Sequence, residues 1–306
     1  MKKNKKHLIG AAEASPIGNI FINILFLALC VCCIYPILLI IGTSFADENY
    51  LSDFGYKIFP EQTSVYAYQY ILKNAGIILR AYGVTIVSTL LGTGISVLVC
   101  GLYAYTISRR EFYFKKFFTF YSFFTMLFNG GMVPWYLVCT RIIGIDDTIW
   151  ALVLPSAVSA WNIMILKTFF ATSVPEAIVE SARIDGASEF RTFFRIVWPI
   201  SLPGLATIGL FAMLAYWNDY YTPLMLTSNQ KLQTLQLYLY NILSNISMLT
   251  NSASAAYQQA GQTVAQLPKE SARMAMCVIT IGPIIFAYPF FQRYFIQGLT
   301  VGAVKG

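Results

Sequence analysis

The feature that most constrains this chain is a series of long apolar segments that lack charged residues. The stretch from Ile20 to Ile41 contains no charged residue, and about 20 apolar residues in a helix cross a hydrocarbon core of about 30 Å. Of the 306 residues, 57% are hydrophobic and 11% are charged. A soluble protein with so few charges could not keep its surface hydrated, so the sequence indicates an integral membrane protein.

Six segments meet the length requirement when the sequence is divided at charges and turn residues. We therefore expect an all-α, polytopic membrane protein with six transmembrane helices near residues 17–42, 80–107, 117–139, 148–166, 201–224 and 274–292. The basic leader Met1–Lys6 imitates a signal peptide, but the apolar run after it is too long and lacks a cleavage site. We expect it to be a retained anchor.

The distribution of Lys and Arg predicts the orientation, because cytoplasmic loops carry an excess of both. With the amino terminus inside, 14 of the 21 basic residues fall in inside segments. Both termini are then cytoplasmic, as residues 1–16 and 296–306. The outside segments are 43–79 and 225–273, and residues 80–295 form the transport domain. This topology accounts for the net charge of +7, so nothing motivates nucleic acid as a partner.

Few residues could support catalysis or bind a metal. The only histidine, His7, lies in the basic tail, and the cysteines read as small apolar residues within apolar runs. A Cys30, Cys32 and Cys33 cluster has no histidine or acidic group beside it. We predict no catalytic residue and no metal site, which disfavours a membrane-embedded enzyme.

The two outside segments are unusually long. The first is expected to hold a short interfacial helix at Tyr66–Leu72. The second contains Asn251 to Gln266, rich in Ser, Ala, Gln and Gly, and this composition predicts an exposed, adaptable loop. A plain tether is the alternative.

The inside segment 167–200 contains its own signals for starting and ending helices. Ser173 to Glu176 fits a capping box with a proline in the first turn, and Gly186 fits the residue that ends a helix. A second helix is expected from Ser188 to Val197, ended by Pro199. Such a compact excursion either docks on a partner or lies on lipid headgroups.

A family resemblance rests on this segment. Glu180-Ser181-Ala182, three residues, Gly186, nine residues, Ile196, one residue and Trp198-Pro199 follow the EAA motif of type I ABC importer membrane subunits. Ser181 replaces the usual alanine and Trp198 the usual leucine. The 183–187 core, Trp217-Asn218 and the carboxyl-terminal tail also resemble carbohydrate permeases. The chain looks most like the smaller maltose-type subunit of the polysaccharide and oligosaccharide branch.

The resemblance implies a multi-pass permease of the bacterial inner membrane with an EAA loop at 173–204. Its partners would be a second homologous permease, two copies of a cytoplasmic ABC ATPase, an extracytoplasmic sugar-binding protein and the lipid bilayer. No cofactor would bind this chain, because it has no Gly-x4-Gly-Lys-Ser/Thr loop; ATP and Mg would bind the ATPase. The implied ATPase-coupling residues are Glu180, Ser181, Ala182, Arg183, Asp185 and Gly186, and Lys305 in the tail would touch the ATPase. Asp185 could equally cap the following turn.

The resemblance also implies that Asn251–Gln266 contacts the sugar-binding protein, through Ser252, Tyr257, Gln258, Gln259 and Gly261. A sugar pathway needs aromatic faces and hydrogen-bonding groups, which the fifth span supplies. Asp219 is its one charge, and intramembrane charges are usually functional. An aromatic belt is the alternative. The candidate pathway residues are Trp217, Asn218, Asp219, Tyr220, Asn129, Trp161 and Asn162.

Two rival functions remain. An ion-driven secondary transporter would show internal repeats and paired intramembrane acids, whereas this sequence has one such acid. An ABC permease for a substrate other than a sugar is the second.

Asn129-Gly130-Gly131 and Pro134 predict a break in the third span. Such a break is tolerated only where the helix faces protein or a cavity.

Overall fold

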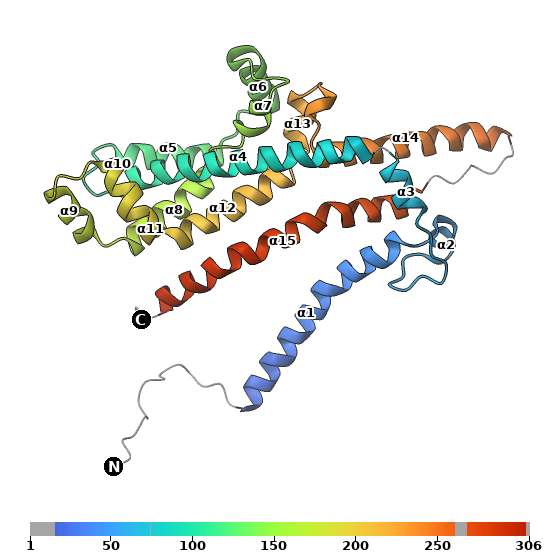
Figure 1. Ribbon diagram of the computed structural model, residues 1–306, viewed down its shortest axis with the longest axis horizontal. Helices are drawn as coiled ribbons and strands as arrows, with labels where there is room; N and C mark the ends of the chain where they lie inside the picture. Colours follow the sequence, from blue (N-terminus) through green and yellow to red (C-terminus); the bar gives the residue numbers. More distant parts are fainter. Residues whose placement is uncertain (1–15, 74, 261–267, 304–306) are drawn as a thin grey trace. The chain divides into compact units, whose positions relative to one another are not determined.

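The computed structural model describes residues 16–73, 75–260 and 268–303, and its regular elements are helices throughout this part of the chain (Figure 1). This confirms the expected all-α class. The α-helices are α1 Pro16–Ser44, α2 Glu48–Phe54, α3 Tyr66–Leu72, α4 Ala75–Ser108, α5 Lys115–Leu127, α6 Met132–Leu137, α7 Ile149–Val153, α8 Ala160–Ser173, α9 Glu176–Ile184, α10 Glu189–Thr192, α11 Trp198–Ile200, α12 Leu202–Trp217, α13 Tyr221–Leu226, α14 Leu235–Ala260 and α15 Glu270–Ala303. Two π-helical turns, η1 Val138–Ile143 and η2 Phe193–Val197, and one 3₁₀ turn, η3 Gln230–Leu232, complete the order.

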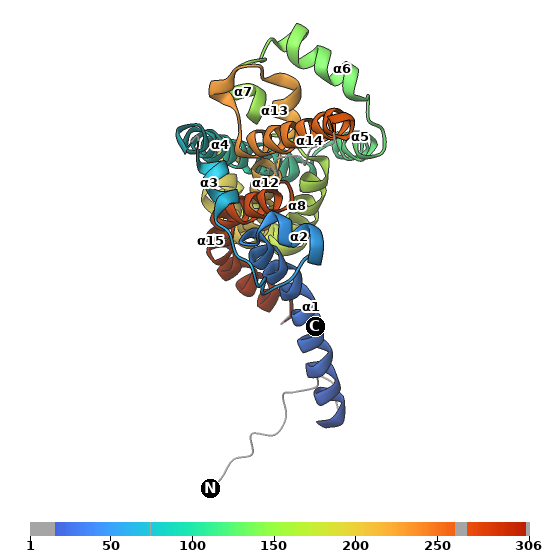
Figure 2. The same cartoon turned by 90° about the vertical axis from the view of Figure 1, so that its right-hand side faces the viewer.

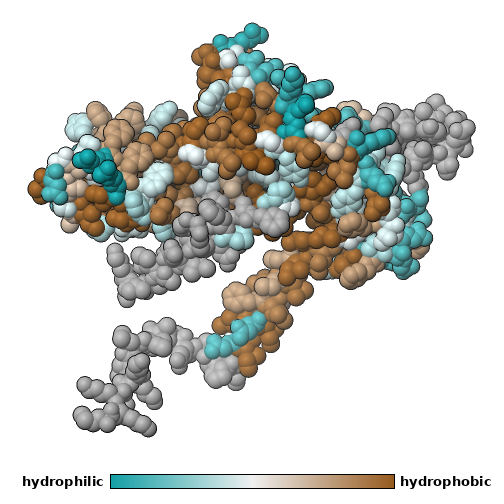
Figure 3. All heavy atoms as spheres, in the orientation of Figure 1, coloured by the Kyte–Doolittle hydropathy of each residue, from teal (hydrophilic) through white to brown (hydrophobic). Residues whose placement is uncertain are grey.

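The chain divides into two compact units, residues 1–70 with 266–278 and residues 71–265 with 279–306. In the first unit, α1 is mostly apolar, with one hydrophilic patch near its amino-terminal end, as Figure 3 shows. None of its most apolar window is buried in the protein. A helix with apolar residues on every side and no protein around it suits a lipid environment.

In the rest of the first unit, acidic side chains form hydrogen bonds at the starts of two helices. Asp47 begins α2 by accepting a hydrogen bond from the Asn49 N–H at 2.9 Å. The Glu48 carboxylate accepts hydrogen bonds from the N–H groups of Glu270 and Ser271, at 2.9 and 3.1 Å. Those N–H groups belong to the first turn of α15 and have no partner within the helix, so Glu48 fixes the start of α15. The predicted helix Tyr66–Leu72 is confirmed as α3.

In the second unit, α4 packs against α12 and α8, and α5 packs against both α4 and α8 (Figure 1). Figure 2 shows the short helices α7 and α13 side by side, and they are in contact. The main apolar core lies where α4, α8 and α12 meet. Its fully buried members are Cys100, Ala104, Ile107, Ile163, Leu166, Val179, Phe193, Val197 and Ile208.

The broken third span is confirmed. Helix α5 ends at Leu127, and Gly131 begins α6 with a φ of 90°, a value that favours glycine. Between them, the Asn129 side-chain oxygen accepts a hydrogen bond from the Gly131 N–H at 2.9 Å. This local hydrogen bond competes with helix continuation.

The prediction of the fourth span as one continuous segment at 148–166 was wrong. The structure has α7 over Ile149–Val153, an irregular stretch, and then α8 over Ala160–Ser173. Helix α7 ends at Val153, just before Leu154 and Pro155, because a proline has no N–H to donate to the helix and its ring clashes with the preceding turn. The fifth span is also interrupted, between Trp217 and Tyr221.

The predicted loop at Asn251–Gln266 was wrong over residues 251–260, which belong to α14. Alanine and glutamine are good helix formers, and no proline or glycine interrupts the sequence from Leu235 to Ala260. Residues 261–266 lie outside the described residues.

By length and composition, two of the described helices can cross a membrane, Gly18–Ser44 and Ala75–Ser108. The number rises to four if two bent pairs each count as one span. In these pairs, α9 turns 80° from α8, and the helix from Glu189 to Ile200 meets α12 at 86°. The two bends lie at the two ends of the cytoplasmic segment, which is expected to leave the membrane. The count of six spans stays a prediction.

Candidate functional site

The segment 173–204 folds as a helix-turn-helix, as predicted. Its first helix, α9, begins after Pro175 rather than at a capping box. Ser173 is the last residue of α8, and Pro175 occupies the N-cap position of α9. The proline ends α8 by fixing its own φ and excluding helical geometry at Val174.

The predicted end of α9 at Gly186 is confirmed. Gly186 has a φ of 78°, in the left-handed region that glycine adopts without steric cost. The Gly186 N–H donates to the Arg183 carbonyl at 3.0 Å, and the Ala187 N–H donates to the Ala182 carbonyl at 2.9 Å. This pair of hydrogen bonds is a Schellman motif, which reverses the chain in two residues.

Helix α9 has one buried and one exposed face. Val179 and Ala182 are buried, so Ala182 packs inward and does not lie on the free surface. The tip of the turn is exposed, and Ile184 is 86% exposed. An apolar side chain so accessible at a chain reversal is a feature of contact surfaces. The other predicted coupling residues, all exposed, are Glu180, Ser181, Arg183, Asp185 and Gly186.

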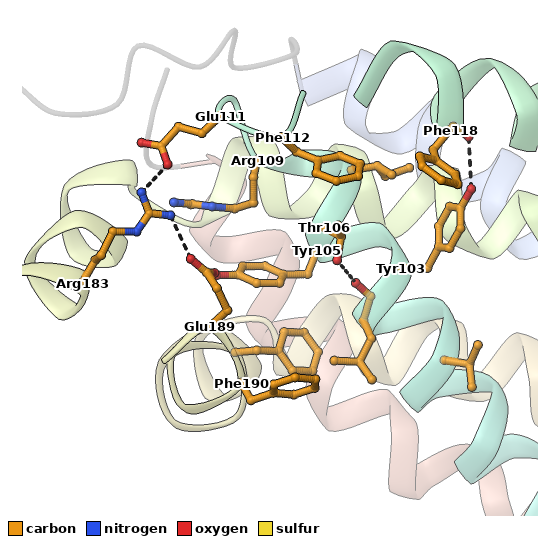
Figure 4. Close-up of a pocket in the computed structure, with 14 residues that line it drawn as sticks. Tyr103, Tyr105, Thr106, Arg109, Glu111, Phe112, Phe118, Arg183, Glu189 and Phe190 are labelled. Atoms are coloured by element: carbon orange, nitrogen blue, oxygen red, sulfur yellow. Dashed lines mark hydrogen bonds and ion pairs between the residues drawn. The ribbon is translucent and has the colours of Figure 1, made fainter. Parts of the chain in front are cut away.

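A charged network joins this helix-turn-helix to the end of α4. The Arg183 guanidinium forms ion pairs with Glu111, in the connection from α4 to α5, and with Glu189, at the start of α10. The Arg183 to Glu189 distance is 2.8 Å. Glu189 also accepts a hydrogen bond from the Tyr105 hydroxyl of α4 at 2.9 Å. Figure 4 shows Arg183 between the two carboxylates.

These contacts shift the pKa values of Glu189 and Arg183. The hydrogen bond from Arg183 lowers the pKa of Glu189. The stability that this contact contributes is therefore complete above the ordinary pKa of a glutamate and is lost as the pH falls through the lowered pKa. The hydrogen bond with Glu111, in turn, raises the pKa of Arg183.

A second ion pair lies at the start of α9, where the Arg110 Nε is 3.2 Å from Glu176. Together with Arg183 and Glu111, it attaches both ends of α9 to the short connection after α4. Sequence reasoning missed Arg110, Glu111 and Glu189, because the pairs join positions far apart in the chain. Charge alternation gives no signal for such contacts.

We expect a double-mutant cycle on Arg183 and Glu111 to be strongly non-additive. Arg183→Ala and Glu111→Ala should each lower stability in thermal unfolding by up to about 1 kcal/mol, because exposed ion pairs are worth that much. The double variant should lose no more than the Arg183→Ala variant. Arg191→Ala is the control, since Arg191 forms no ion pair within the described chain. Strictly additive losses would contradict the network.

The second half of the segment rests on a buried aromatic cluster. The Phe193 ring lies 5.2 Å from Tyr105 and 5.6 Å from Trp198, measured between ring centroids. The helix does not end at Pro199 as predicted. It continues to Ile200 through the π-helical turn η2, because the wider turn rearranges the hydrogen bonds that a proline would interrupt.

At the other end of α12, the predicted pathway residues have different environments. Trp217 is buried, and its indole N–H donates to the Thr280 carbonyl at 3.3 Å. Asp219 lies two residues before α13, and its carboxylate accepts a hydrogen bond from the Thr222 N–H in the first turn at 2.9 Å. This hydrogen bond gives Asp219 a local structural role at the break between α12 and α13.

An exposed aromatic and amide surface lies beside them. The Tyr220 ring stacks on Tyr240 of α14 with centroids 5.2 Å apart and planes at 22°. The Gln236 side-chain amide donates to the Asn218 amide oxygen at 3.4 Å. Sequence reasoning found Asn218 and Tyr220 but missed Gln236 and Tyr240, because α14 was expected to be part of a loop segment.

The remaining predicted residues are scattered. Asn129 and Trp161 are exposed, whereas Asn162 is buried in α8. Ser252, Tyr257, Gln258 and Gln259 lie on α14 rather than in a loop. Gly261 and Lys305 lie outside the described residues.

Comparisons with known proteins agree on one family. Residues 96–301 match the family of binding-protein-dependent transport system inner membrane components. The chain is 35% identical to YtcP, the Bacillus subtilis polygalacturonan/rhamnogalacturonan transport system permease protein, over 90% of this chain and 93% of that protein. It is 36% identical to Bacillus subtilis protein LplC, over 94% and 96% of the two chains.

A solved structure is similar over nearly its whole length. It is the crystal structure of a bacterial ABC transporter involved in the import of the acidic polysaccharide alginate. The likeness has a TM-score of 0.74 at 26% identity and covers 94% of this chain and all of that chain.

Proposed function

The chain belongs to the family of binding-protein-dependent transport system inner membrane components, and from this membership we propose how it works. It is a permease subunit of an ABC importer for oligosaccharide or polysaccharide sugars. The exposed chain reversal at Ile184 to Gly186 is the observation that carries the proposed mechanism. It offers a short, rigid knob to a partner at the end of a membrane-spanning bundle.

The knob is proposed to dock on a cytoplasmic ABC ATPase. ATP and Mg then bind that partner, since this chain has no Gly-x4-Gly-Lys-Ser/Thr sequence. Two ATPase copies, a second homologous permease and an extracytoplasmic sugar-binding protein complete the importer in the bacterial inner membrane. The tail, with Lys305, is a further proposed ATPase contact.

ATPase closure would reach the membrane helices through the contacts described above. A displacement of α9 pulls Arg183, and with it Glu111 and the end of α4. The same displacement moves the aromatic core around Phe193, which packs against α4 and the start of α12. Rigid elements with two arrangements are what alternating access requires.

The sugar pathway is proposed to run beside the aromatic and amide surface. A pyranose ring has C–H patches that pack on aromatic faces and hydroxyl groups that bond to amides. Tyr220 with Tyr240 provides the first, and Asn218 with Gln236 provides the second. Trp217 and Asp219 flank Asn218 in the chain and are fixed by their own hydrogen bonds to Thr280 and Thr222.

The carboxyl-terminal part of α14 and the residues after it are the proposed contact for the sugar-binding protein. Ser252, Tyr257, Gln258, Gln259 and Gly261 remain the candidates. On a helix such residues would present a fixed face, which differs from the adaptable loop expected from composition.

Co-purification and transport test the function. The tagged chain, isolated from its native membrane, should bring with it an ABC ATPase and a second permease. In liposomes the assembly should accumulate a labelled oligosaccharide only with ATP, Mg and the binding protein. Uptake by the chain alone, driven by an ion gradient without ATP, would overturn the proposal and support a secondary transporter.

A further inference from the structure

A cavity of about 750 Å³ lies at the end of α4 that leads into the ion-pair network, and Glu111, Arg183 and Glu189 of that network form part of its lining. One wall is the last three turns of α4, and the others come from the connection to α5, the start of α5, α9 and α10. Figure 4 shows the cavity with the ion pairs at its mouth. Its apolar lining comes mainly from Val99, Leu102, Tyr103, Phe112, Phe118 and Phe190.

The cavity is on the outer side of α4. Cys100 and Ala104 are buried in the core on the inner face of this helix and do not line the cavity, whereas the core residue Ile107 borders both. Val99 and Thr106, on the cavity side, are exposed and lie about 10 Å apart along the helix axis, at 1.5 Å per residue. The cavity therefore extends from the end of a membrane-spanning helix toward the hydrocarbon region.

A cationic group that forms no ion pair among the described residues sits at its mouth. The Arg109 Nε is buried and has no hydrogen-bond partner within the described chain, and its guanidinium lies 5.8 Å from the centroid of the Tyr105 ring. In Figure 4, this guanidinium points toward that of Arg183. Arg183 has two carboxylate partners, whereas Arg109 has no ion pair within the described residues. A buried Nε–H without an acceptor, on a guanidinium without an ion pair, favours an anionic acceptor beside it.

The surrounding sequence is also basic. Residues 109–116 contain Arg109, Arg110, Lys115 and Lys116 but only one acidic residue, Glu111. The Lys115 ammonium donates to the Ser108 carbonyl at 3.1 Å, so it is held close to the end of α4. Basic residues beside a membrane span attract anionic lipids.

We propose that this cavity binds one anionic phospholipid. Its phosphate pairs with the Arg109 guanidinium, and one acyl chain lies along α4 past Leu102 to Val99 against the aromatic wall. A mainly apolar cavity with a cation that lacks an ion pair at the headgroup end matches a charged amphiphile better than a peptide, which would need partners for its backbone N–H and C=O groups. The site does not depend on which sugar is transported.

The lipid would also have a structural consequence. It would occupy the space between α4, the connection carrying Glu111, and Phe190 of α10. These are the elements that the Arg183 network joins. Occupancy would therefore brace the coupling contacts from the side that faces lipid.

Lipid retention measures the site directly. The full chain, purified with its partners, is equilibrated with vesicles of equal parts phosphatidylglycerol and phosphatidylcholine, re-extracted, and analysed by native mass spectrometry. We expect one phosphatidylglycerol retained in preference to phosphatidylcholine. Arg109→Gln should lower its retention about fivefold, because one basic group near a membrane surface contributes about that factor. Val99→Trp, which fills the inner end of the slot, should lower it as well.

Two matched controls keep the result interpretable. Arg195→Gln removes an exposed basic residue of the same segment that does not line the cavity, and Leu91→Trp adds a large side chain at an exposed position of α4 outside it. Both should retain phosphatidylglycerol. Equal retention of the two lipids, or equal loss in Arg195→Gln, overturns the proposal. So does unchanged retention in Arg109→Gln and Val99→Trp, or loss of the second permease or ATPase from these two variants in place of lipid.

Discussion

Replacing Gly186 with tryptophan is expected to abolish ATP-driven transport while the chain still inserts in the membrane. Gly186 has a φ of 78°, and an L-residue in the left-handed region costs roughly 1–2 kcal/mol. No heavy atom of the described chain lies within 4 Å of the added Cβ, so the variant should fold. The indole would project from the tip of the turn, where the ATPase is proposed to dock.

The expected loss of ATPase binding and transport is large because the exposed turn at Ile184 to Gly186 is small, so a bulky residue there would disturb most of the contact. Interface positions at the centre of a contact change affinity by 2 kcal/mol or more, which corresponds to more than about tenfold. The quantity to measure is the amount of ATPase that co-purifies with the tagged Gly186→Trp chain, together with ATP-dependent uptake. We expect both to fall more than about tenfold.

A matched variant separates strain from docking. Gly144 ends the turn η1 with a φ of 68° and also has no described heavy atom within 4 Å of an added Cβ. Gly144→Trp therefore carries the same backbone strain far from the proposed ATPase contact. It should keep its ATPase. Equal losses in both variants, or normal transport in Gly186→Trp, would remove Gly186 from the docking contact.

The sequence predicted best where local chemistry decides the structure. The helix Tyr66–Leu72, the break at Asn129 to Gly131 and the end of α9 at Gly186 all follow from residues within one turn of the feature. Glycine and asparagine act through their own backbone, so their effect is visible in a single sequence.

Hydropathy was a poorer guide to where helices end. The window over 148–166 contains no charged residue, so its hydropathy hid Pro155, which ends α7 because it has no N–H to continue the helix. Composition misled in the opposite direction at Asn251–Ala260. A stretch rich in Ser, Ala and Gln looks like a loop, yet these residues are compatible with the helix that α14 continues there.

The candidate site could be predicted only as a list of positions. The exposed turn of α9 was expected, but the contacts that attach it to α4 join residues 72 and 84 positions apart. One sequence contains no information about which distant charges meet. The same limit applies to Tyr220 and Tyr240, which come together only because α13 and α14 pack against each other.

Replacing Gly92 with leucine is expected to destabilise the second unit more than any surface change in it. An added Cβ at Gly92 would lie 2.4 Å from the Tyr216 ring of α12. That ring is 5% exposed, and its hydroxyl donates to the Val153 carbonyl at 2.7 Å. Overpacking of this kind costs about 1–3 kcal/mol, and a buried carbonyl left without its donor costs about 1–3 kcal/mol more.

The control lies two residues away on the same helix. Gly94 is exposed, and no described heavy atom lies within 4 Å of its added Cβ. Gly94→Leu gains the same helix propensity and presents an apolar side chain on an open face. In thermal unfolding in detergent, the midpoint temperature of Gly92→Leu should be well below that of the parent. The midpoint of Gly94→Leu should equal the parent's or exceed it.

The position of Gly92 ties this loss of stability to transport. Helix α4 leads into the connection that holds Arg183, and α12 follows directly on the aromatic core around Phe193. The two helices approach closely at Gly92, so they can carry a displacement of α9 together. ATP-dependent uptake by Gly92→Leu should therefore fall even at temperatures where the protein remains folded, whereas parental stability and uptake would show that α4 and α12 do not pack as described.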